Sequence, residues 1–464
     1  MDSLILSREL GSIDPSLLRR YFTNRQIYAL QRSLTTFDDG HGVPVLAELP
    51  KLPSSGVNAL AVDGGEGRLL LSGSADGSVR IWDLAQTSPS DLAPRLHPTA
   101  TLRGTPQVKV HSRVPNPSKA IAHTAGITYI SFYPFDPNAL LSAGYDHRLL
   151  LCSTDPLSPV VSFSLSAPIH TAALSPIASH LLCAAGTADP YVRLVDLKSG
   201  SSSHSLSGHH GAVLAVAWSP IREWVLASGG VDGTVRLWDI RRSSSCVGLL
   251  DAGDTRGIIG RDTTAKFGGG AHDGAVNGLA WTEDGKMLVS AGHDSELRVW
   301  DGMTGADQLI TFGHAIQNSH VGNVTPIHVP RAVTAPGKRI VLWPNERELL
   351  MVEITDGTVI KRLAVPGHLI AAASGRSQRR APGPLKTRIT AASYRGGGAV
   401  EVYSGYSDGS IVAWKPRTTE ESLVEDLGEV VGEFTGRDRD GKRKADILDD
   451  VLQDISLKRP PNPF

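Results

Sequence analysis

The feature that most constrains the fold of this 464-residue chain is a repeated spacing between two residues. An aspartate is followed six residues later by a tryptophan in four places, and the same offset ends in another residue in two more. The six pairs are Asp76 with Trp82, Asp146 with Cys152, Asp189 with Val195, Asp232 with Trp238, Asp294 with Trp300 and Asp408 with Trp414. A motif that recurs every few tens of residues indicates a chain of similar structural units.

Two further residue types repeat with these pairs. A serine stands four residues before the aspartate in five units, and a histidine stands 22 or 23 residues before it in three. Buried polar groups need hydrogen-bond partners, so histidine, serine, aspartate and tryptophan at these positions favour a buried structural network. The residues predicted to form it are His210, Ser228, Asp232 and Trp238 in one unit and His272, Ser290, Asp294 and Trp300 in the next.

Between these anchors the sequence is typical of short antiparallel strands. Apolar or alternating runs, such as residues 213–218 and 234–238, end in Ser-Pro, Asp-Gly or similar turn residues. Four such strands in about 40 residues make one blade of a β-propeller. The spacing predicts seven blades, and the sixth, around residues 341–354, lacks the repeated motif. The blade cores are expected to begin near Gly56, His123, His170, Gly208, His272, Val321 and Gly367.

The predicted fold is therefore an all-β, seven-bladed propeller over residues 43–416, preceded by a helical segment over residues 1–42. A propeller with a free edge exposes unpaired backbone groups, so the last blade needs an outer strand from elsewhere in the chain. We expect the segment Val43–Leu49 to supply it. Residues 417–464 form a charged tail that we expect to be mostly disordered, with one short amphipathic helix.

Composition narrows the functions that such a fold serves. Lys and Arg total 46 and Asp and Glu total 47, so the formal net charge of −1 gives no long-range attraction to nucleic acid or anionic lipid. The three cysteines, Cys152, Cys183 and Cys246, lack the spacing of a zinc site or a disulfide framework. No segment approaches the roughly 18 apolar residues of a membrane span. We expect no cofactor, no metal and no membrane contact.

Insertions interrupt the predicted ring. Residues 85–120 are rich in Pro and Ser, residues 248–270 are rich in Gly, and residues 374–388 are basic. The basic residues are Arg376, Arg379, Arg380, Lys386 and Arg388. This concentration of positive charge favours contact with phosphates or with an acidic partner, although a charged loop is more often simply solvated. Direct contact with nucleic acid stays open.

Two patterns invite a catalytic interpretation. The run Gly405 to Gly409 matches the G-x-S-x-G elbow of hydrolases, with Ser407 as nucleophile, but that elbow needs a helix after the serine and a strand-like run follows here. His210, Ser228 and Asp232 resemble a catalytic triad, yet the same trio recurs one unit later, as a structural network does. We therefore interpret the chain as a binding protein and not as an enzyme.

The N-terminal segment is too apolar for a simple tail. Asp14 and Pro15 offer a helix cap followed by proline at the first helical position. Seven apolar residues follow, interleaved with four arginines; they are Leu17, Leu18, Tyr21, Phe22, Ile27, Tyr28 and Leu30, with Arg19, Arg20, Arg25 and Arg32. This two-sided character is typical of a helix that inserts into a partner's groove. The alternative is a helix packed on the propeller's own rim.

One blade carries an unusual arginine. Trp238 and Asp239 are followed by Ile240 and then by Arg241 and Arg242, so that Arg241 stands just past the end of a strand. The other Trp-Asp pairs, at residues 82–83 and 300–301, have no arginine two residues further on. Its position after the strand places Arg241 at one face of the propeller, where its side chain can reach solvent.

These residues resemble the WD-repeat family, and within it the WDxR-bearing substrate receptors of cullin-4 RING E3 ubiquitin ligases. The resemblance covers roughly residues 1–415 in order. It is strongest in four stretches, Asp14–Leu30, Val192–Gly200, Ala215–Pro220 and Val235–Arg242. Motifs inside the blades are shared by many propellers, whereas the N-terminal segment together with the WDxR sequence is more specific.

The resemblance implies a nuclear, non-catalytic receptor, monomeric within its complex, that docks on the adaptor called DNA damage-binding protein 1. Its further partners are repair factors and RNA polymerase II stalled at DNA lesions, in transcription-coupled nucleotide excision repair. By analogy the adaptor-binding residues are Leu17, Leu18, Arg19, Arg20, Tyr21, Tyr28, Asp239, Arg241 and Arg242. The competing hypothesis is a WD-repeat scaffold in chromatin or RNA processing, with no ligase attached.

Overall fold

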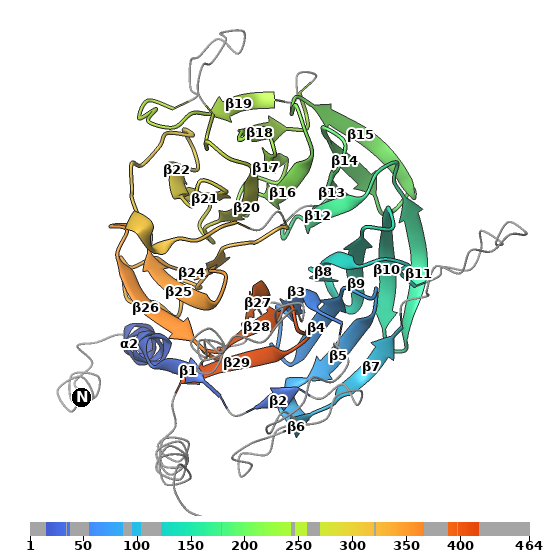
Figure 1. The fold of residues 1–464 in the computed structure, drawn as a ribbon, viewed down its shortest axis with the longest axis horizontal. Helices are drawn as coiled ribbons and strands as arrows, with labels where there is room; N and C mark the ends of the chain where they lie inside the picture. The colour runs from blue at the N-terminus through green and yellow to red at the C-terminus, as the bar shows by residue number, and fades with distance from the viewer. Residues whose placement is uncertain are drawn as a thin grey trace, which may run out of the picture. The chain divides into compact units, whose positions relative to one another are not determined.

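Seven small antiparallel sheets stand in a ring, as the ribbon in Figure 1 shows for the described part of the chain. This computed structural model describes residues 15–33, 35–37, 55–86, 95–103, 122–177, 179–242, 246–257, 270–319, 322–365, 388–396 and 398–416. Each sheet is one blade, and neighbouring blades share apolar side chains from their inner strands. The predicted all-β, seven-bladed propeller is confirmed.

The blades follow one another along the chain, each built from its innermost strand outward. Blade one is β3 (Val57–Val62), β4 (Leu69–Ser74), β5 (Val79–Asp83) and β7 (Pro98–Leu102), and blade two is β8 (Ile127–Tyr133), β9 (Asp136–Gly144), β10 (Arg148–Thr154) and β11 (Leu157–Ser164). Blade three is β12 (Ile169–Leu174), β13 (Leu182–Thr187), β14 (Tyr191–Asp196) and β15 (Ser201–Ser207), and blade four is β16 (Val213–Trp218), β17 (Val225–Gly230), β18 (Val235–Asp239) and β19 (Cys246–Leu250).

The last three blades are less regular. Blade five is β20 (Val276–Trp281), β21 (Met287–Gly292) and β22 (Leu297–Asp301), and blade six is β23 (Ile327–His328), β24 (Ile340–Pro344), β25 (Glu348–Glu353) and β26 (Val359–Ala364). Blade seven is β27 (Ile389–Tyr394), β28 (Val402–Tyr406), β29 (Ile411–Pro416) and β1 (Leu30–Arg32). Outside the blades are α2 (Pro15–Tyr28), β2 (Thr36–Phe37), β6 (Arg95–Leu96) and the short helices η1 (Leu84–Gln86) and η2 (Gly313–Ala315).

The strand order gives the ring two distinct faces. Because consecutive strands of a blade are antiparallel, the connections from first to second strand and from third to fourth strand emerge on the same face. The helix α2 contacts one of these connections, residues 329–339, so we call this the helix face. The connections from second to third strand emerge on the other side, which we call the turn face.

The ring is closed by a strand other than the predicted one. β1 pairs antiparallel with β29, with Leu30 opposite Pro416 and Arg32 opposite Trp414. The prediction that Val43–Leu49 supplies this strand is wrong, and that segment lies outside the described residues. The closing strand comes earlier in the chain because Ile27 and Leu30 are buried among side chains of blades six and seven. This burial places the chain beside β29 directly after the helix. The ring therefore begins before residue 43.

A second contact ties the closure to the first blade. After β1 the chain passes to β2, which pairs with β6 in a parallel two-stranded sheet. The ring of Phe37 in β2 packs edge-on against Trp82 of blade one, with centroids 5.3 Å apart, and against Tyr403 of blade seven at 6.0 Å. The N-terminal segment thus joins the two blades between which the ring would otherwise open (Figure 1).

Blade five departs from the predicted four strands. Within the described residues its sheet has three strands, and only a single bridge, from Trp300 to Asp307, marks the outer position. The carboxylate of Asp307 accepts hydrogen bonds from the backbone N–H groups of Gly253 and Leu309, and Leu309 has a positive φ of 54°. The chain therefore turns away before a fourth strand can form. Blade six, which was assigned on spacing and strand content without the repeated motif, does have four strands.

The predicted insertions are shorter than expected. The outer strand of blade one, β7, lies inside residues 85–120, and β19 extends to Leu250, inside residues 248–270. Most of the basic insertion, residues 374–387, and the tail, residues 417–464, lie outside the described residues. Among the described helices, none is long and apolar enough to cross a membrane.

Candidate protein-docking face

The buried network of histidine, serine, aspartate and tryptophan is complete in blades four and five, although the histidine of blade four is not the predicted one. In blade five, Nδ1 of His272 lies 2.9 Å from Oδ2 of Asp294, Nε2 of His272 lies 2.7 Å from Oγ of Ser290, and Nε1 of Trp300 donates to the same oxygen at 2.8 Å. Blade two repeats the contacts among His123, Ser142 and Asp146, but Cys152 stands at the position of the tryptophan.

The histidine in blade four is His209 and not the predicted His210. Nδ1 of His209 lies 3.1 Å from Asp232, Nε2 lies 2.7 Å from Ser228, and Trp238 donates to Ser228 at 2.7 Å. His210 is exposed and gives only its backbone N–H to Asp232. Two adjacent histidines satisfy the sequence spacing equally, and the inward one is selected by its distance from Ser228.

The network is structural. Nε1 of Trp238 donates to the Ser228 hydroxyl, which also lies within hydrogen-bond distance of Nε2 of His209, and Nδ1 of the same ring faces the Asp232 carboxylate. Burial by itself raises the pKa of Asp232, but the hydrogen bonds from His209 and from the His210 backbone outweigh it and hold that pKa well below its usual value. Ser228 and Ser290 are fully buried, so no substrate reaches their hydroxyl groups.

Ser407 lies in an ordinary hairpin turn. It follows β28 and precedes β29, where the hydrolase elbow needs a helix. Its backbone N–H donates to the carbonyl of Arg388, and its hydroxyl accepts the Arg388 backbone N–H at 3.2 Å. Among the described residues, no group of three His, Cys, Asp or Glu side chains is placed to hold a metal ion.

Arg241 stands on the helix face in a fixed orientation. Its Nε donates to Oδ1 of Asp239 at 3.0 Å and its Nη2 donates to Oδ2 at 2.8 Å, which is the two-pronged geometry in which guanidinium binds carboxylate most strongly. The hydrogen bonds from Arg241 hold the pKa of Asp239 below its usual value, although burial opposes this shift. The Arg241 side chain is 61% exposed while that of Asp239 is 8% exposed. A nearly buried carboxylate thus positions an open guanidinium.

Arg242 contributes less to this arrangement. Its Nε lies 3.8 Å from Asp239, and its side chain is 65% exposed. Blade one offers a comparison, because Asp83, the aspartate of its Trp-Asp pair, is held by Arg68, with Nη2 2.7 Å from Oδ2. Arg68 lies in the connection from β3 to β4, whereas Arg241 lies two residues after Asp239, in the connection from β18 to β19. The two blades therefore place similar ion pairs at different points of the helix face.

The helix α2 is seated on blade six. Oγ1 of Thr23 donates to the carbonyl of Val333 at 3.0 Å, Nε of Arg20 donates to the carbonyl of Thr334 at 3.1 Å, and Oδ1 of Asn24 accepts the N–H of Ala335 at 3.1 Å. At the end of the helix Nζ of Lys361 donates to the carbonyls of Tyr28 and Leu30. These contacts favour the alternative in which the helix packs on the propeller's own rim.

The helix nevertheless keeps an outer side. Arg19, Phe22 and Arg25 are exposed at spacings of three residues, which places them on one side of the helix, and Phe22 is 39% exposed. Of the predicted docking residues, Arg20 and Tyr28 are partly buried, so they hold the helix to the ring. The side chains of Leu17, Leu18 and Tyr21 lie outside the described part of the structure.

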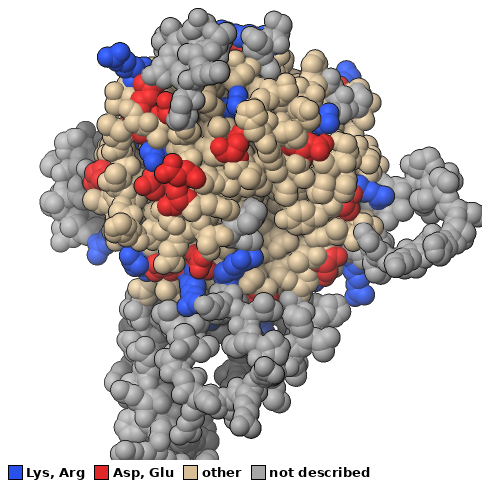
Figure 2. Space-filling view, turned by 45° about the horizontal axis from the view of Figure 1, so that its top comes forward, with Lys and Arg blue, Asp and Glu red and all other residues tan. Residues whose placement is uncertain are grey.

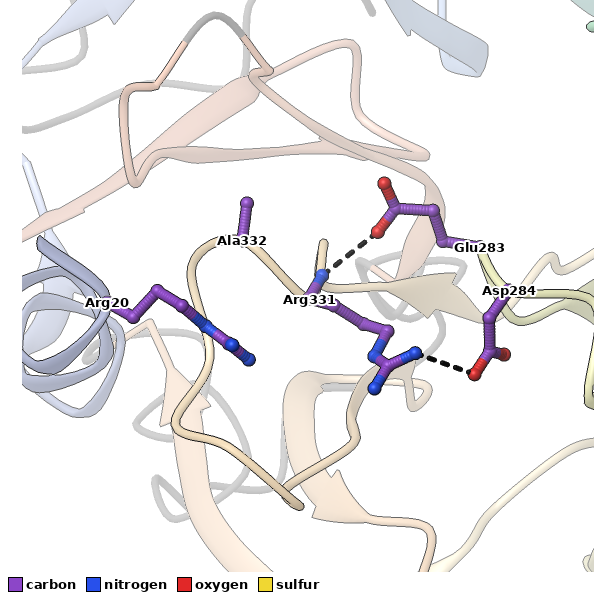
Figure 3. A pocket seen from close by; sticks show the side chains of 5 residues that line it. All are labelled: Arg20, Glu283, Asp284, Arg331 and Ala332. Carbon is purple, nitrogen blue, oxygen red and sulfur yellow. Dashed lines mark hydrogen bonds and ion pairs between the residues drawn. The ribbon is translucent and has the colours of Figure 1, made fainter. Parts of the chain in front are cut away.

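A pocket marks the seam between α2 and the ring. It measures about 390 Å³ and is lined by Arg20, Glu283, Asp284, Arg331 and Ala332. In Figure 3, Arg20 reaches from the helix toward the loop that carries Arg331, and the two acids stand on the far side. Nη1 of Arg331 lies 3.0 Å from Asp284, and the Arg331 backbone donates to Glu283. Arg331 is thus paired with Asp284, while Arg20 donates to the Thr334 carbonyl beside them.

Exposed apolar side chains continue the helix face from blade three to blade five. They are Ile177, Leu181, Ile221 and Met303, each at least 37% exposed. Their loops are in contact, since Glu223 accepts hydrogen bonds from Ser179 and Arg222 donates to the carbonyl of Gly302. Apolar side chains grouped beside a fixed arginine are typical of a protein-binding surface.

The distribution of charge on the surface bears on whether the protein binds nucleic acid. Figure 2 shows basic and acidic side chains of the described residues interspersed on this view, several of them side by side, with no continuous basic patch. Nucleic-acid binding relies on basic side chains that follow a phosphate backbone. The face in Figure 2 does not favour that mode of binding.

Comparisons with known proteins agree with this architecture. The family model described as "WD domain, G-beta repeat" matches residues 48–83, 200–239 and 264–301. The WD repeat-containing protein ATCSA-1 of Arabidopsis thaliana is 31% identical over 370 residues, which cover 66% of this chain and 77% of that protein.

Other relatives match a smaller part of the chain. The ribosome biogenesis protein ytm1 of Neosartorya fischeri is 31% identical over 265 residues, covering 53% of this chain and 52% of that protein. The corresponding protein of Chaetomium globosum is 30% identical over 265 residues, covering 51% and 54%. WD-repeat propellers generally serve as scaffolds or receptors. With seven blades, the repeated Asp-to-Trp motif and a relative matched over most of its length, the chain belongs to the WD-repeat family.

Proposed function

We propose that this chain is the substrate-recognition subunit of a cullin-4 RING E3 ubiquitin ligase. In this role it docks on the adaptor DNA damage-binding protein 1 and acts in the nucleus, in transcription-coupled nucleotide excision repair at stalled RNA polymerase II. It has no catalytic part of its own and recruits the ligase to its target. The similarity to the Arabidopsis protein supports a receptor of the Cockayne syndrome group A type.

The observation that carries the proposal is the placement of Arg241 and α2 on one face. Arg241 is oriented by Asp239, and α2 is fixed by Thr23 and Arg20 with Phe22 turned outward. A charged anchor that is already held in its binding geometry loses little entropy when a partner binds. We propose that Arg241 binds a polar or acidic site on the adaptor while Phe22 and the neighbouring Leu17, Leu18 and Tyr21 bind an apolar groove, with Arg19 and Arg25 at its polar rim.

Co-purification from cells tests the proposal. Tagged wild-type chain is expected to recover the adaptor and cullin-4, and ultraviolet irradiation is expected to add RNA polymerase II. Arg241→Glu is expected to abolish recovery of the adaptor and cullin-4. Arg68→Glu, which breaks the similar ion pair in blade one, serves as the matched control and is expected to keep them. Equal recovery with Arg241→Glu and wild type contradicts the proposal.

The second candidate is a scaffold in RNA processing. The specific observation for it is the match to ytm1 proteins over about half of this chain. In that case the seated helix α2 serves only to close the ring, and the chain binds preribosomal particles with no adaptor. Sedimentation of the tagged chain with preribosomal particles, with no adaptor in the same fractions, favours the scaffold.

A further inference from the structure

One turn on the turn face has a different geometry from the others of its kind. In five blades the residue after the turn aspartate has a positive φ; these residues are Gly77, His147, Gly233, Ser295 and Gly409. In the same five turns the aspartate Oδ1 accepts the backbone N–H two residues further on. The aspartate therefore caps its own turn.

Blade three cannot form this turn because Pro190 follows Asp189. Proline fixes φ near −65° and has no N–H to donate, so it excludes both the positive φ and the hydrogen bond that Gly77 or Gly233 donates across its turn. Blade three also has Ser166 at the position of His209, Ala185 at that of Ser228 and Val195 at that of Trp238. Asp189 is thus retained where the other members of the buried network are replaced.

The carboxylate of Asp189 is partly exposed, as are those of Asp76 and Asp408 in the other two blades whose turn aspartate has no buried histidine against it. Its side chain is 38% exposed, against 2% for Asp146 and 9% for Asp232. Both contacts that this carboxylate makes within the described residues use Oδ2: Ser166 Oγ donates to it at 3.0 Å, and Nη2 of Arg193 lies 3.8 Å away. Oδ1 remains as an acceptor on the surface.

Exposed tyrosines lie on the same turn as Asp189 and on the corresponding turn of blade two. Tyr191 is 37% exposed, and the guanidinium of Arg193 lies 5.4 Å from its ring centroid. Tyr145, on the adjoining turn of blade two, is 44% exposed and packs edge-on against His170 at 5.8 Å. The two turns are connected, because His147 Nδ1 donates to the carbonyl of Ser166. A carboxylate with tyrosine faces is the combination that recognises an organic cation.

We propose that this corner of the turn face binds a lysine or arginine side chain of a partner segment. The cation is held by Asp189 Oδ1, and its aliphatic stem lies against Tyr191 and Tyr145. Charge complementarity selects this occupant, because the acceptor atom left open is anionic and Arg193 already lies against Oδ2. The site lies on the face opposite Arg241, so it does not depend on adaptor docking.

Selection from a random 12-residue peptide library tests the site. Peptides that bind the full-length wild-type chain but not Asp189→Asn are expected to share a lysine or arginine at a fixed position. Their affinity is expected to fall about tenfold or more in Asp189→Asn, since a charge-assisted hydrogen bond is lost. Asp76→Asn removes the same charge from the turn of blade one on the same face, and it is expected to change the affinity less than about twofold, as for an exposed charge.

A charge-conserving variant gives the sharper comparison. Pro190→Gly permits the positive φ and the capping hydrogen bond of the other turns, which would engage Oδ1 while the net charge stays the same. It is expected to lose binding as Asp189→Asn does, with an unchanged thermal midpoint as evidence of folding. Three results overturn the proposal: no peptide that distinguishes wild type from Asp189→Asn, selected peptides without a basic position, or equal losses in Asp76→Asn and Asp189→Asn. Adaptor binding by Pro190→Gly, measured in parallel, keeps this test separate from that of the proposed function.

Discussion

Arg241 is bound by Asp239 through two hydrogen bonds of 3.0 and 2.8 Å, and the arginine is open to solvent while the aspartate is nearly buried. The pair costs the fold little and contributes little to it, because exposed ion pairs stabilise proteins by less than about 1 kcal/mol. Its consequence is orientation. Like the aspartates of the other two Trp-Asp pairs, Asp239 accepts the backbone N–H two residues further on. It also directs the Arg241 side chain outward from the helix face.

Removing the charge of Asp239 is therefore expected to weaken docking without unfolding the protein. Asp239→Asn leaves Arg241 in place but loosens its two-pronged contact, so we expect an affinity for the adaptor about fivefold lower. Asp83→Asn, which loosens Arg68 in the same way, is the control and is expected to leave the affinity unchanged. Isothermal titration calorimetry on both variants measures the difference. A larger loss in Asp83→Asn than in Asp239→Asn would show that the account of Arg241 is wrong.

The two sides of α2 are expected to respond to mutation in different ways. Phe22→Glu changes an exposed side chain and is expected to lower adaptor affinity about tenfold with little change in stability. Ile27→Ala removes a fully buried side chain and is expected to lower the free energy of unfolding by about 3 kcal/mol. Urea titration and adaptor binding on the same samples separate the effects. If Phe22→Glu binds as wild type does, the outer side of α2 is not a docking surface.

Replacing the network serine by alanine is expected to lower the free energy of unfolding by different amounts in blades five and one. Ser290→Ala removes the partner of both Trp300 and His272, so we expect a loss of about 2 kcal/mol in the free energy of unfolding. Ser72→Ala removes the partner of Trp82 in a blade that has no such histidine, so we expect about 1 kcal/mol. Chemical denaturation ranks the two. The reverse order would mean that the histidine adds nothing to the network.

Acid should destabilise the ring through the aspartates of the network. Burial raises the pKa of Asp294, but the hydrogen bond and the charge of His272 outweigh it and leave that pKa below its usual value, and Asp146 is similar. A lowered folded-state pKa gives stability that is complete above the unfolded value of about 3.9 and is lost as pH falls through the folded value. We expect the free energy of unfolding to fall below about pH 4, and to fall less steeply in Asp294→Asn. An equal slope in the variant contradicts this assignment.

The sequence predicted the blades because their chemistry is local. An aspartate in the turn and a tryptophan six residues on define one hairpin, and repetition of the hairpin defines the ring. The closing strand was missed because three residues, Leu30 to Arg32, carry no alternation of their own and are positioned by a helix that packs on a distant blade. Val43–Leu49 has the composition of a better strand. Composition does not show, however, which blade the chain lies beside when the helix ends.

The errors at single residues have the same origin. His209 and His210 are indistinguishable by spacing, and only the distance to Ser228 selects one. Within the described residues blade five has no outer strand, because Asp307 accepts hydrogen bonds that turn the chain away, one of them from a residue 54 positions away. The orientation of Arg241 by Asp239, in contrast, links residues two positions apart, and the sequence located it correctly just past the strand.

The affinity of the purified chain for purified adaptor is the most direct test of the central claim. We predict that Arg241→Ala raises the dissociation constant about 30-fold, as expected for an interface anchor, while Arg68→Ala changes it less than twofold. Biolayer interferometry with immobilised adaptor gives both values, and circular dichroism verifies the fold. Tight binding by wild type that depends on Arg241 and not on Arg68 is the predicted result. Absence of binding by wild type, or equal binding by Arg241→Ala and wild type, would contradict it.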